Sequence, residues 1–291
     1  MFSVQCAVSF HKGLRKPNNE DNFLLQWRLL KNADIEEGSI CQTAGLLQKG
    51  FFGVFDGLGG LADGEQASFL AAKTMQKQVW LPPMRAGEGR LSELLSKLNK
   101  AVFSAAKEKQ CKMGTTAAVM LLDKQNAVIG NVGDSRVYLY RQGTLRQLSE
   151  DHSDRELLEE MGIEDRKPSL MQYVGLSLNE VTPTISAHAH QNGDRFLLCS
   201  DGLTDMVSDA EIEGLCGKEK DPQVCTKALV NLALEHGGKD NITAMICDVK
   251  HILCWKKRVP LEKEAGKGEI DDEKDCDCSV ADPQQGDQEG C

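Results

Sequence analysis

The sequence predicts an α+β fold. Short apolar runs of strand-like composition, punctuated by Gly and Asp, alternate irregularly with a few stretches of helical periodicity. This order lacks the regular strand–helix alternation of a doubly wound parallel sheet. Near residue 256 the composition changes to Glu, Asp, Gly and Gln with almost no apolar residues, which cannot bury enough surface to fold. We therefore expect one folded domain over residues 1–253 and a disordered acidic tail with several cysteines over residues 254–291.

Six apolar runs predict strands. The run 51–55 is continuously apolar and ends in Asp56-Gly57, which is typical of a buried strand that carries a carboxylate at its end. Residues 141–144 have the composition of a hairpin loop after the strand at 136–140. The other predicted strands are 115–122, 127–132, 196–199 and 242–249.

Apolar residues at helical spacing predict helices over residues 64–79 and 91–109. Later helices are indicated by their start signals. Ser153 and Ser208 each precede a Glu by three residues, the pattern of a capping box. Asp221-Pro222 predicts another helix start, and Gly237-Gly238 predicts the end of that helix.

Charge and cysteine usage restrict the classes of partner and compartment. The net charge of −10 and pI near 5.2 argue against nucleic acid or an anionic membrane as a partner, because both require a basic surface. No apolar run approaches the about 18 residues needed to cross a bilayer. The eleven cysteines are scattered, and several lie inside apolar runs, as in a reducing compartment. We expect a cytoplasmic protein.

Five segments place acidic residues beside turn or strand-end positions. They contain Glu20-Asp21, Asp56-Gly57, Gly133-Asp134, the segment Asp201 to Asp205, and Asp240-Asn241. A single Asp-Gly pair is as well explained by a turn. Five such segments, several of them after apolar runs, favour a site for Mg²⁺ or Mn²⁺, since these cations prefer carboxylate and carbonyl oxygens.

Seven short motifs occur in an order that resembles a known family. They are Arg-x-x-Asn-Asn-Glu-Asp, Phe-Asp-Gly-x-Gly-Gly, Gly-Thr-Thr-Ala, Asn-Val-Gly-Asp-Ser-Arg, Asp-His-Ser, Ser-Asp-Gly-Leu-x-Asp and Asp-Asn-Ile-Thr, between Arg15 and Thr243. Together they resemble the type 2C metal-dependent (PPM) protein phosphatases. This resemblance implies a sandwich of two antiparallel β-sheets flanked by helices, with the metals at one end, and makes residues 1–253 the catalytic domain.

The resemblance also implies a role for each acidic residue. Asp56 would bridge two core metals, with Gly57 ligating through its carbonyl, and Asp201 and Asp240 would complete the first metal site. Glu20 and Asp21 would hold metal-bound waters. Asp134 and Asp205 correspond to a looser third metal site.

The activity implied is hydrolysis of phosphoserine and phosphothreonine in proteins by a water that bridges two Mg²⁺ or Mn²⁺ ions. The implied partners are phosphoprotein substrates and a cognate Ser/Thr kinase or its targets, and we expect a monomer. Two alternatives stay open: a non-catalytic phosphoprotein-binding member of the same fold, and a phosphohydrolase for a small metabolite.

Two positions depart from the family's pattern. Leu58 stands where many eukaryotic members have His, and an apolar residue here is typical of bacterial members. The phosphate-binding Arg of the family aligns with Lys16, and Arg15 lies one residue earlier. Either cation could contact the substrate phosphate, with Arg15 slightly favoured because its guanidinium can bind two oxygens.

Overall fold

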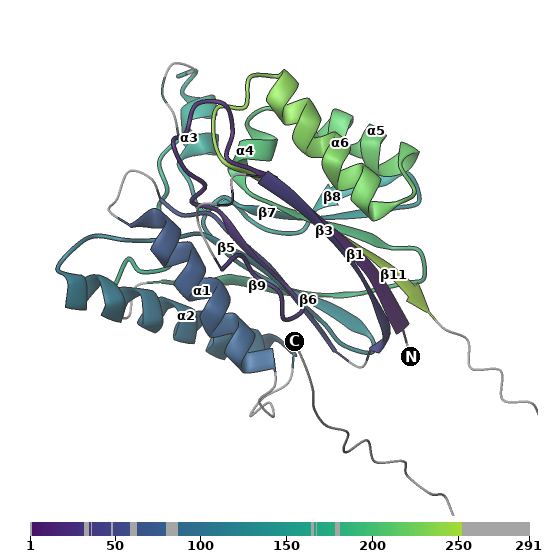
Figure 1. Ribbon diagram of the computed structural model, residues 1–291, viewed down its shortest axis with the longest axis horizontal. Coiled ribbons are helices and arrows are strands. Elements are labelled where there is room, and N and C mark those ends of the chain that lie inside the picture. Colours follow the sequence, from purple (N-terminus) through teal and green to yellow (C-terminus); the bar gives the residue numbers. More distant parts are fainter. Residues whose placement is uncertain are drawn as a thin grey trace, which may run out of the picture. The chain divides into compact units, whose positions relative to one another are not determined.

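Two antiparallel sheets form the centre of the computed structural model (Figure 1). The structure describes residues 2–31, 35, 37–47, 49–58, 63–79, 87–163, 166, 168–177 and 181–251, without the side chains of 43–47. The tail expected at 254–291 lies outside these residues. The six-stranded sheet has the order β3 (Glu37–Leu47), β1 (Phe2–His11), β11 (Ile242–His251), β10 (Arg195–Cys199), β7 (Arg136–Arg141), β8 (Thr144–Gln147). The five-stranded sheet has the order β2 (Asn22–Leu25), β4 (Gly50–Phe55), β5 (Ala117–Leu122), β6 (Asn126–Val132), β9 (Thr184–Ala189).

The two sheets pack face to face around a shared apolar core. In β1, Val4 and Val8 are completely buried in the cluster that also contains Phe52 of β4 and Met245 of β11. Cys6 and Phe10 belong to the same cluster, and the residues that alternate with these four point the opposite way, as the two-residue period of a strand requires. Ser9, for example, lies 2.8 Å from the hydroxyl of Thr226 in a helix on the outer face. The predicted sandwich is confirmed.

Helices cover the outer face of each sheet (Figure 1). On the five-stranded sheet lie α1 (Gly64–Val79) and α2 (Gly87–Lys109), which bury Leu91 and Leu95 against it. On the six-stranded sheet lie α4 (Asp201–Thr204), α5 (Asp209–Lys218) and α6 (Pro222–Glu235). The short α3 (Arg155–Glu160) follows β8. Among the described residues, no helix combines the length and apolar character that crossing a membrane requires.

The predicted start signals of α5 and α6 and the predicted end of α6 are confirmed. Ser208 and Glu211 form the reciprocal capping box at the start of α5. The Asp221 carboxylate accepts from two backbone N–H groups of the first turn of α6. After α6, Gly237 and Gly238 both have positive φ, the conformation that ends a helix.

The capping box predicted at Ser153 is wrong. α3 begins at Arg155 with Asp154 at the N-cap position, and no side chain caps it. Backbone pairing of Ser153 with Leu170 holds Ser153 in an extended conformation. The carboxylate of Asp154 instead accepts from the backbone N–H of Ser169, at 2.6 Å. The contacts of Ser153 and Asp154 with residues 169–170 therefore replace the capping box that the local sequence predicted.

Candidate metal centre

The acidic residues singled out by the sequence lie where strands of both sheets begin or end. From the five-stranded sheet, Asp21 precedes β2, Asp56 follows β4 and Asp134 lies just beyond β6. From the six-stranded sheet, Asp201 follows β10 and Asp240 precedes β11. Asp56 feels the negative charge of all four others, so the fold gathers these carboxylates into one group.

The backbone of Asp56 is fixed by the Gly-Thr-Thr-Ala segment. The Asp56 N–H donates to Thr116 Oγ1 at 3.0 Å, and the Asp56 carbonyl accepts from Thr115 Oγ1 and from the Thr116 N–H, both at 2.8 Å. Three hydrogen bonds on one residue leave its backbone little freedom. The threonines thus orient the central carboxylate.

Gly57 occupies a place that only glycine can fill. Its N–H donates to the Glu20 carbonyl at 3.2 Å. A Cβ at this position would lie 2.4 Å from the Gly64 carbonyl oxygen and 2.6 Å from that of Glu20. Because both obstacles are backbone atoms, neither can swing aside. The absence of a side chain at Gly57 lets the segments of Glu20 and Asp56 come together.

Asp21 is buried between the two sheets. Its Oδ2 accepts from the hydroxyls of Ser200 and Thr243, each at 2.7 Å. Its Oδ1 has no hydrogen-bond partner in the described part of the chain. Burial raises the pKa of Asp21 to about 7, and the charges of Asp240 and Asp201 add to this against the effect of the two hydroxyls.

The pKa values of the other carboxylates in the group are raised as well. Burial, followed by the charges of Asp21 and the other carboxylates, raises the pKa of Asp56 well above its usual range. Burial and the charge of Asp201 raise the pKa of Asp134 to about 7. Burial also raises the pKa of Glu20. Without a cation, the group therefore favours protonation over full charge.

The two cations considered for phosphate binding differ in position. Lys16 is half-buried, and its Nζ lies 2.6 Å from Asp240 Oδ1. Burial lowers the pKa of Lys16, but the hydrogen bond to Asp240 and the charges of Asp56 and Glu20 raise it further, so the net direction is upward. Arg15 is exposed. Of these two cations, Lys16 is the one for which the described residues show electrostatic contact with the carboxylate group.

Asp205 lies at the C-terminal end of α4. Its Oδ1 accepts from Arg155 Nη2 of α3 at 2.8 Å, and its charge raises the pKa of Asp134. The pair expected at a third metal site is thus electrostatically coupled, and Asp205 also connects α4 to α3.

The donor set fits a hard divalent cation. Among the described residues, no three Asp, Glu, His or Cys side chains converge closely enough to form a complete ligand set by themselves. Mg²⁺ and Mn²⁺ do not require one, because they bind few carboxylates and keep several waters. Mutually repelling carboxylates and the unpartnered, buried Asp21 Oδ1 are the features that a cation with its waters would neutralise.

Comparison with known proteins identifies the family. The model of the family "Protein phosphatase 2C" matches residues 18–242. The chain belongs to the protein phosphatase 2C family. It is 34% identical over 210 residues to the serine/threonine phosphatase stp of Listeria welshimeri, covering 67% of this chain and 82% of that protein. It is 33% identical over 266 residues to the serine/threonine protein phosphatase PstP of Mycobacterium tuberculosis, covering 84% of this chain and 45% of that protein.

Solved structures agree with the sequence comparison. The crystal structure of PstP from M. tuberculosis superimposes with a TM-score of 0.71 at 28% identity, covering 86% of this chain and all of that chain. The PstP catalytic domain in complex with two manganese ions gives 0.70 at 29% identity, with the same coverage. The predicted family, its bacterial character, the fold, the phosphatase activity and the Mg²⁺ or Mn²⁺ dependence are confirmed.

Sequence reasoning missed the polar residues that hold the acidic ones. Besides Ser200 and Thr243, Asn241 accepts from the Glu20 N–H at 2.8 Å and donates to the carbonyls of Lys12 and Asn18. It thereby fixes the loop that carries Lys16. A usable signal was present, since Ser200 and Asn241 are immediate neighbours of Asp201 and Asp240, and Thr243 ends the same Asp-Asn-Ile-Thr motif.

Proposed function

We propose that this phosphatase removes phosphate from serine and threonine side chains of proteins with two core Mn²⁺ or Mg²⁺ ions held by Asp56, Gly57, Asp201 and Asp240. When bound, these ions supply an activated water and neutralise charge on the phosphoryl oxygens. The observation that carries the proposal is the gathering of carboxylates from both sheets into one group whose members raise one another's pKa. The two manganese ions of the PstP catalytic domain support the number of core ions.

Other acidic residues of the chain would hold metal-bound waters and a third cation. Asp21, oriented by Ser200 and Thr243, and Glu20, oriented by Asn241, would hold metal-bound waters. Asp134 and Asp205 form a third, looser cation site, for which the Arg155 guanidinium competes.

Lys16 would hold the substrate phosphate. Its ammonium lies beside Asp240 and feels the charges of Asp56 and Glu20. With Asp240 neutralised by a bound cation, this ammonium would be available to a phosphate dianion. Exposed Arg15 would at most assist from the rim.

The physiological setting is part of the proposal. Substrates are phosphoproteins, supplied by a Ser/Thr kinase or its targets, and the relatives' printed names support protein as the substrate class. We propose a cytoplasmic location, which the scattered and largely buried free cysteines of the described residues support, and a monomeric state.

The test is hydrolysis of a phosphothreonine peptide by the purified protein with Mn²⁺, with Mg²⁺ and with EDTA. We expect activity with either metal, loss with EDTA, and no effect of okadaic-acid-type inhibitors. Full activity in metal-free buffer would refute the proposal.

The same experiment separates the alternatives. Binding of the peptide without phosphate release, at saturating Mn²⁺, would identify a non-catalytic member. A kcat/KM for a small phosphorylated metabolite far above that for the phosphopeptide would identify a metabolite phosphohydrolase.

A further inference from the structure

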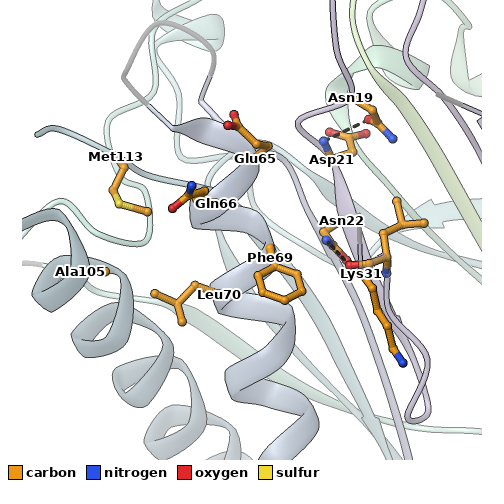
Figure 2. A pocket seen from close by; sticks show the side chains of 11 residues that line it. Asn19, Asp21, Asn22, Lys31, Glu65, Gln66, Phe69, Leu70, Ala105 and Met113 are labelled. Carbon is orange, nitrogen blue, oxygen red and sulfur yellow. Dashed lines mark hydrogen bonds between the residues drawn. The ribbon is translucent and has the colours of Figure 1, made fainter. Parts of the chain in front are cut away.

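The Asp-His-Ser motif at residues 151–153 lies outside both the carboxylate group and the cavity beside α1. That cavity, of about 510 Å³, has Asp21 and residues of α1 and α2 in its lining, as Figure 2 shows. His152 lies elsewhere, against the segment that follows β6 and carries Asp134. The motif therefore contacts the segment of the proposed third cation site, where its central residue can have a role.

His152 holds Gly133, the residue directly before Asp134, by both of its peptide groups. The backbone N–H of His152 donates to the Gly133 carbonyl at 2.9 Å. The ring nitrogen Nδ1 of His152 accepts from the Gly133 N–H at 3.4 Å. Asn131 Nδ2 donates to the same Gly133 carbonyl at 3.0 Å. The two peptide groups that flank the Gly133 Cα are thus restrained, and one of them leads to Asp134.

Gly133 requires such restraint. Its φ is +103°, in the left-handed region that favours glycine, and a Cβ here would lie 2.7 Å from Thr116 Cγ2. Because glycine has more conformational freedom than any other residue, contacts must hold it in one conformation. On the other side of Asp134, Ser135 Oγ lies 2.6 Å from Thr116 Oγ1. Asp134 therefore lies between two restrained neighbours, and His152 restrains the first of them.

The tautomer of the His152 ring follows from its contacts. Because Nδ1 accepts, the proton of the neutral ring is on Nε2, which donates to Thr184 Oγ1 at 2.8 Å. The Thr184 hydroxyl donates in turn to Glu150 Oε2 at 3.4 Å. Burial lowers the pKa of His152 against the charges of Glu150 and Asp151, which favours the neutral ring. The first residue of β9 thus orients the acceptor nitrogen toward Gly133.

We propose that His152 is a positioning residue of the third cation site and orients Asp134 by accepting from the Gly133 N–H through Nδ1. This role rests on the proposed cation site of Asp134 and Asp205, and it includes no contact of His152 with the cation or the substrate. Loss of the Nδ1 acceptor should therefore weaken binding of the third cation. The two core ions should be unaffected, because their proposed ligands are on other segments.

The test compares side chains that keep or lose the acceptor. His152→Asn places an amide oxygen where Nδ1 lies, whereas His152→Leu has a similar shape and no acceptor. Mn²⁺ is titrated into the full-length protein, and the free ion is followed by electron paramagnetic resonance. We expect two tighter sites and one looser site in the wild type. His152→Leu should weaken the looser site about tenfold, as loss of a residue that supports a metal ligand does, and His152→Asn should weaken it less than about threefold.

His188→Leu is the matched control. His188 is also a half-buried histidine, it is on the same strand as Thr184, and its ring contacts Ser186. Its substitution should leave all Mn²⁺ affinities unchanged. Amide hydrogen exchange, followed by NMR, is a second measurement that needs no metal. The Gly133 N–H should exchange faster in His152→Leu than in His152→Asn or the wild type.

Equal weakening of the looser site by His152→Leu and His152→Asn would show that the ring only packs, and unchanged affinities in both would show that it does not serve the cation. Equal weakening of the core sites would show general damage to the fold. Each of these results overturns the proposal. A wild type with two Mn²⁺ sites and no third also overturns it and leaves the core ions in place, whereas a wild type that binds no Mn²⁺ refutes the proposed function. If His152→Leu does not fold by circular dichroism, His152→Gln replaces it, because its amide lies at the position of Nε2.

Discussion

Asp21→Asn should stabilise the metal-free protein at alkaline pH. Asn mimics the protonated acid, and its carbonyl can still accept from Ser200 and Thr243. In the folded protein the pKa of Asp21 is about 7, against 3.8 for an unperturbed Asp. A pKa difference of about 3, at about 1.4 kcal/mol for each pKa unit, corresponds to roughly 4 kcal/mol in the free energy of unfolding.

The sign follows from proton binding. An acid whose folded pKa is raised holds its proton in the folded state between pH 4 and 7, when the unfolded state has released it. Stability is therefore highest below pH 4 and falls as pH rises to about 7. Between pH 5 and pH 8 the wild type should lose roughly 3 kcal/mol from Asp21, and Asp21→Asn should not.

The assay is denaturant or thermal unfolding in EDTA at pH 5 and pH 8. At pH 8 the variant should melt roughly 10 °C above the wild type, at about 2–4 °C per kcal/mol for a domain of this size. Glu108→Gln, which removes an exposed carboxylate from α2, is the control and should change little. Equal stability of the variant and the wild type at pH 8 would show that burial and the neighbouring carboxylates do not raise the pKa of Asp21.

Three further predictions concern catalysis. Lys16→Ala should raise KM for a phosphopeptide severalfold or more, because the phosphate dianion loses a charge-assisted partner, and Arg15→Ala should have a mild effect. Normal KM values in both variants and in the double variant would show that the Arg15–Lys16 segment does not line the cleft. Asp201→Asn and Asp240→Asn should each abolish turnover while the fold persists by circular dichroism; near-wild-type kcat at saturating Mn²⁺ would show that the metal site lies elsewhere. Deleting residues 256–291 should leave kcat on a small phosphopeptide within about twofold, and a tenfold loss would make that segment part of the site.

Two of the strands that the sequence predicted, at 51–55 and 196–199, are continuous apolar runs, and the strand at 127–132 is interrupted only by Asn131. Helices cover one face of each strand and the other sheet covers the opposite face, so both faces are apolar. Helix α1 has the bounds predicted from its periodicity. Local composition decides these elements, so the pattern was sufficient.

Three strands that were not predicted, β1, β3 and β9, owe their conformation to partners that are distant in the sequence. β1 pairs with β11 from Phe2↔His251 to His11↔Ile242, and β3 pairs with β1. β9 is half-exposed along its length and takes its register from β6. None of these partners is close in the sequence, so a local pattern could not indicate the pairing.

The site residues that the sequence predicted also differ from those that it missed in whether a local pattern marks them. Acidic residues such as Asp56 and Asp201 were visible because each follows an apolar run and neighbours a Gly. The hydroxyls of Ser200 and Thr243, which reach Asp21 across the two sheets, carry no periodic signal. Likewise, Lys16 and Arg15 are adjacent in the sequence, and only the tertiary contact with Asp240 distinguishes them.

The pairing of β1 with β11 also determines how early during its synthesis the chain can complete the fold of the enzyme. The strand that contains Phe2 must wait for residues 242–251 before its central neighbour is available. At about 5–20 residues per second, that wait is roughly 10–50 s. Throughout it, the apolar face of β1 lacks the β11 half of its packing, and Asp240 has not yet joined the other carboxylates. A ribosome-bound nascent chain therefore needs protection from aggregation long before it can dephosphorylate anything, and catalysis begins only when the last strand closes the sheet.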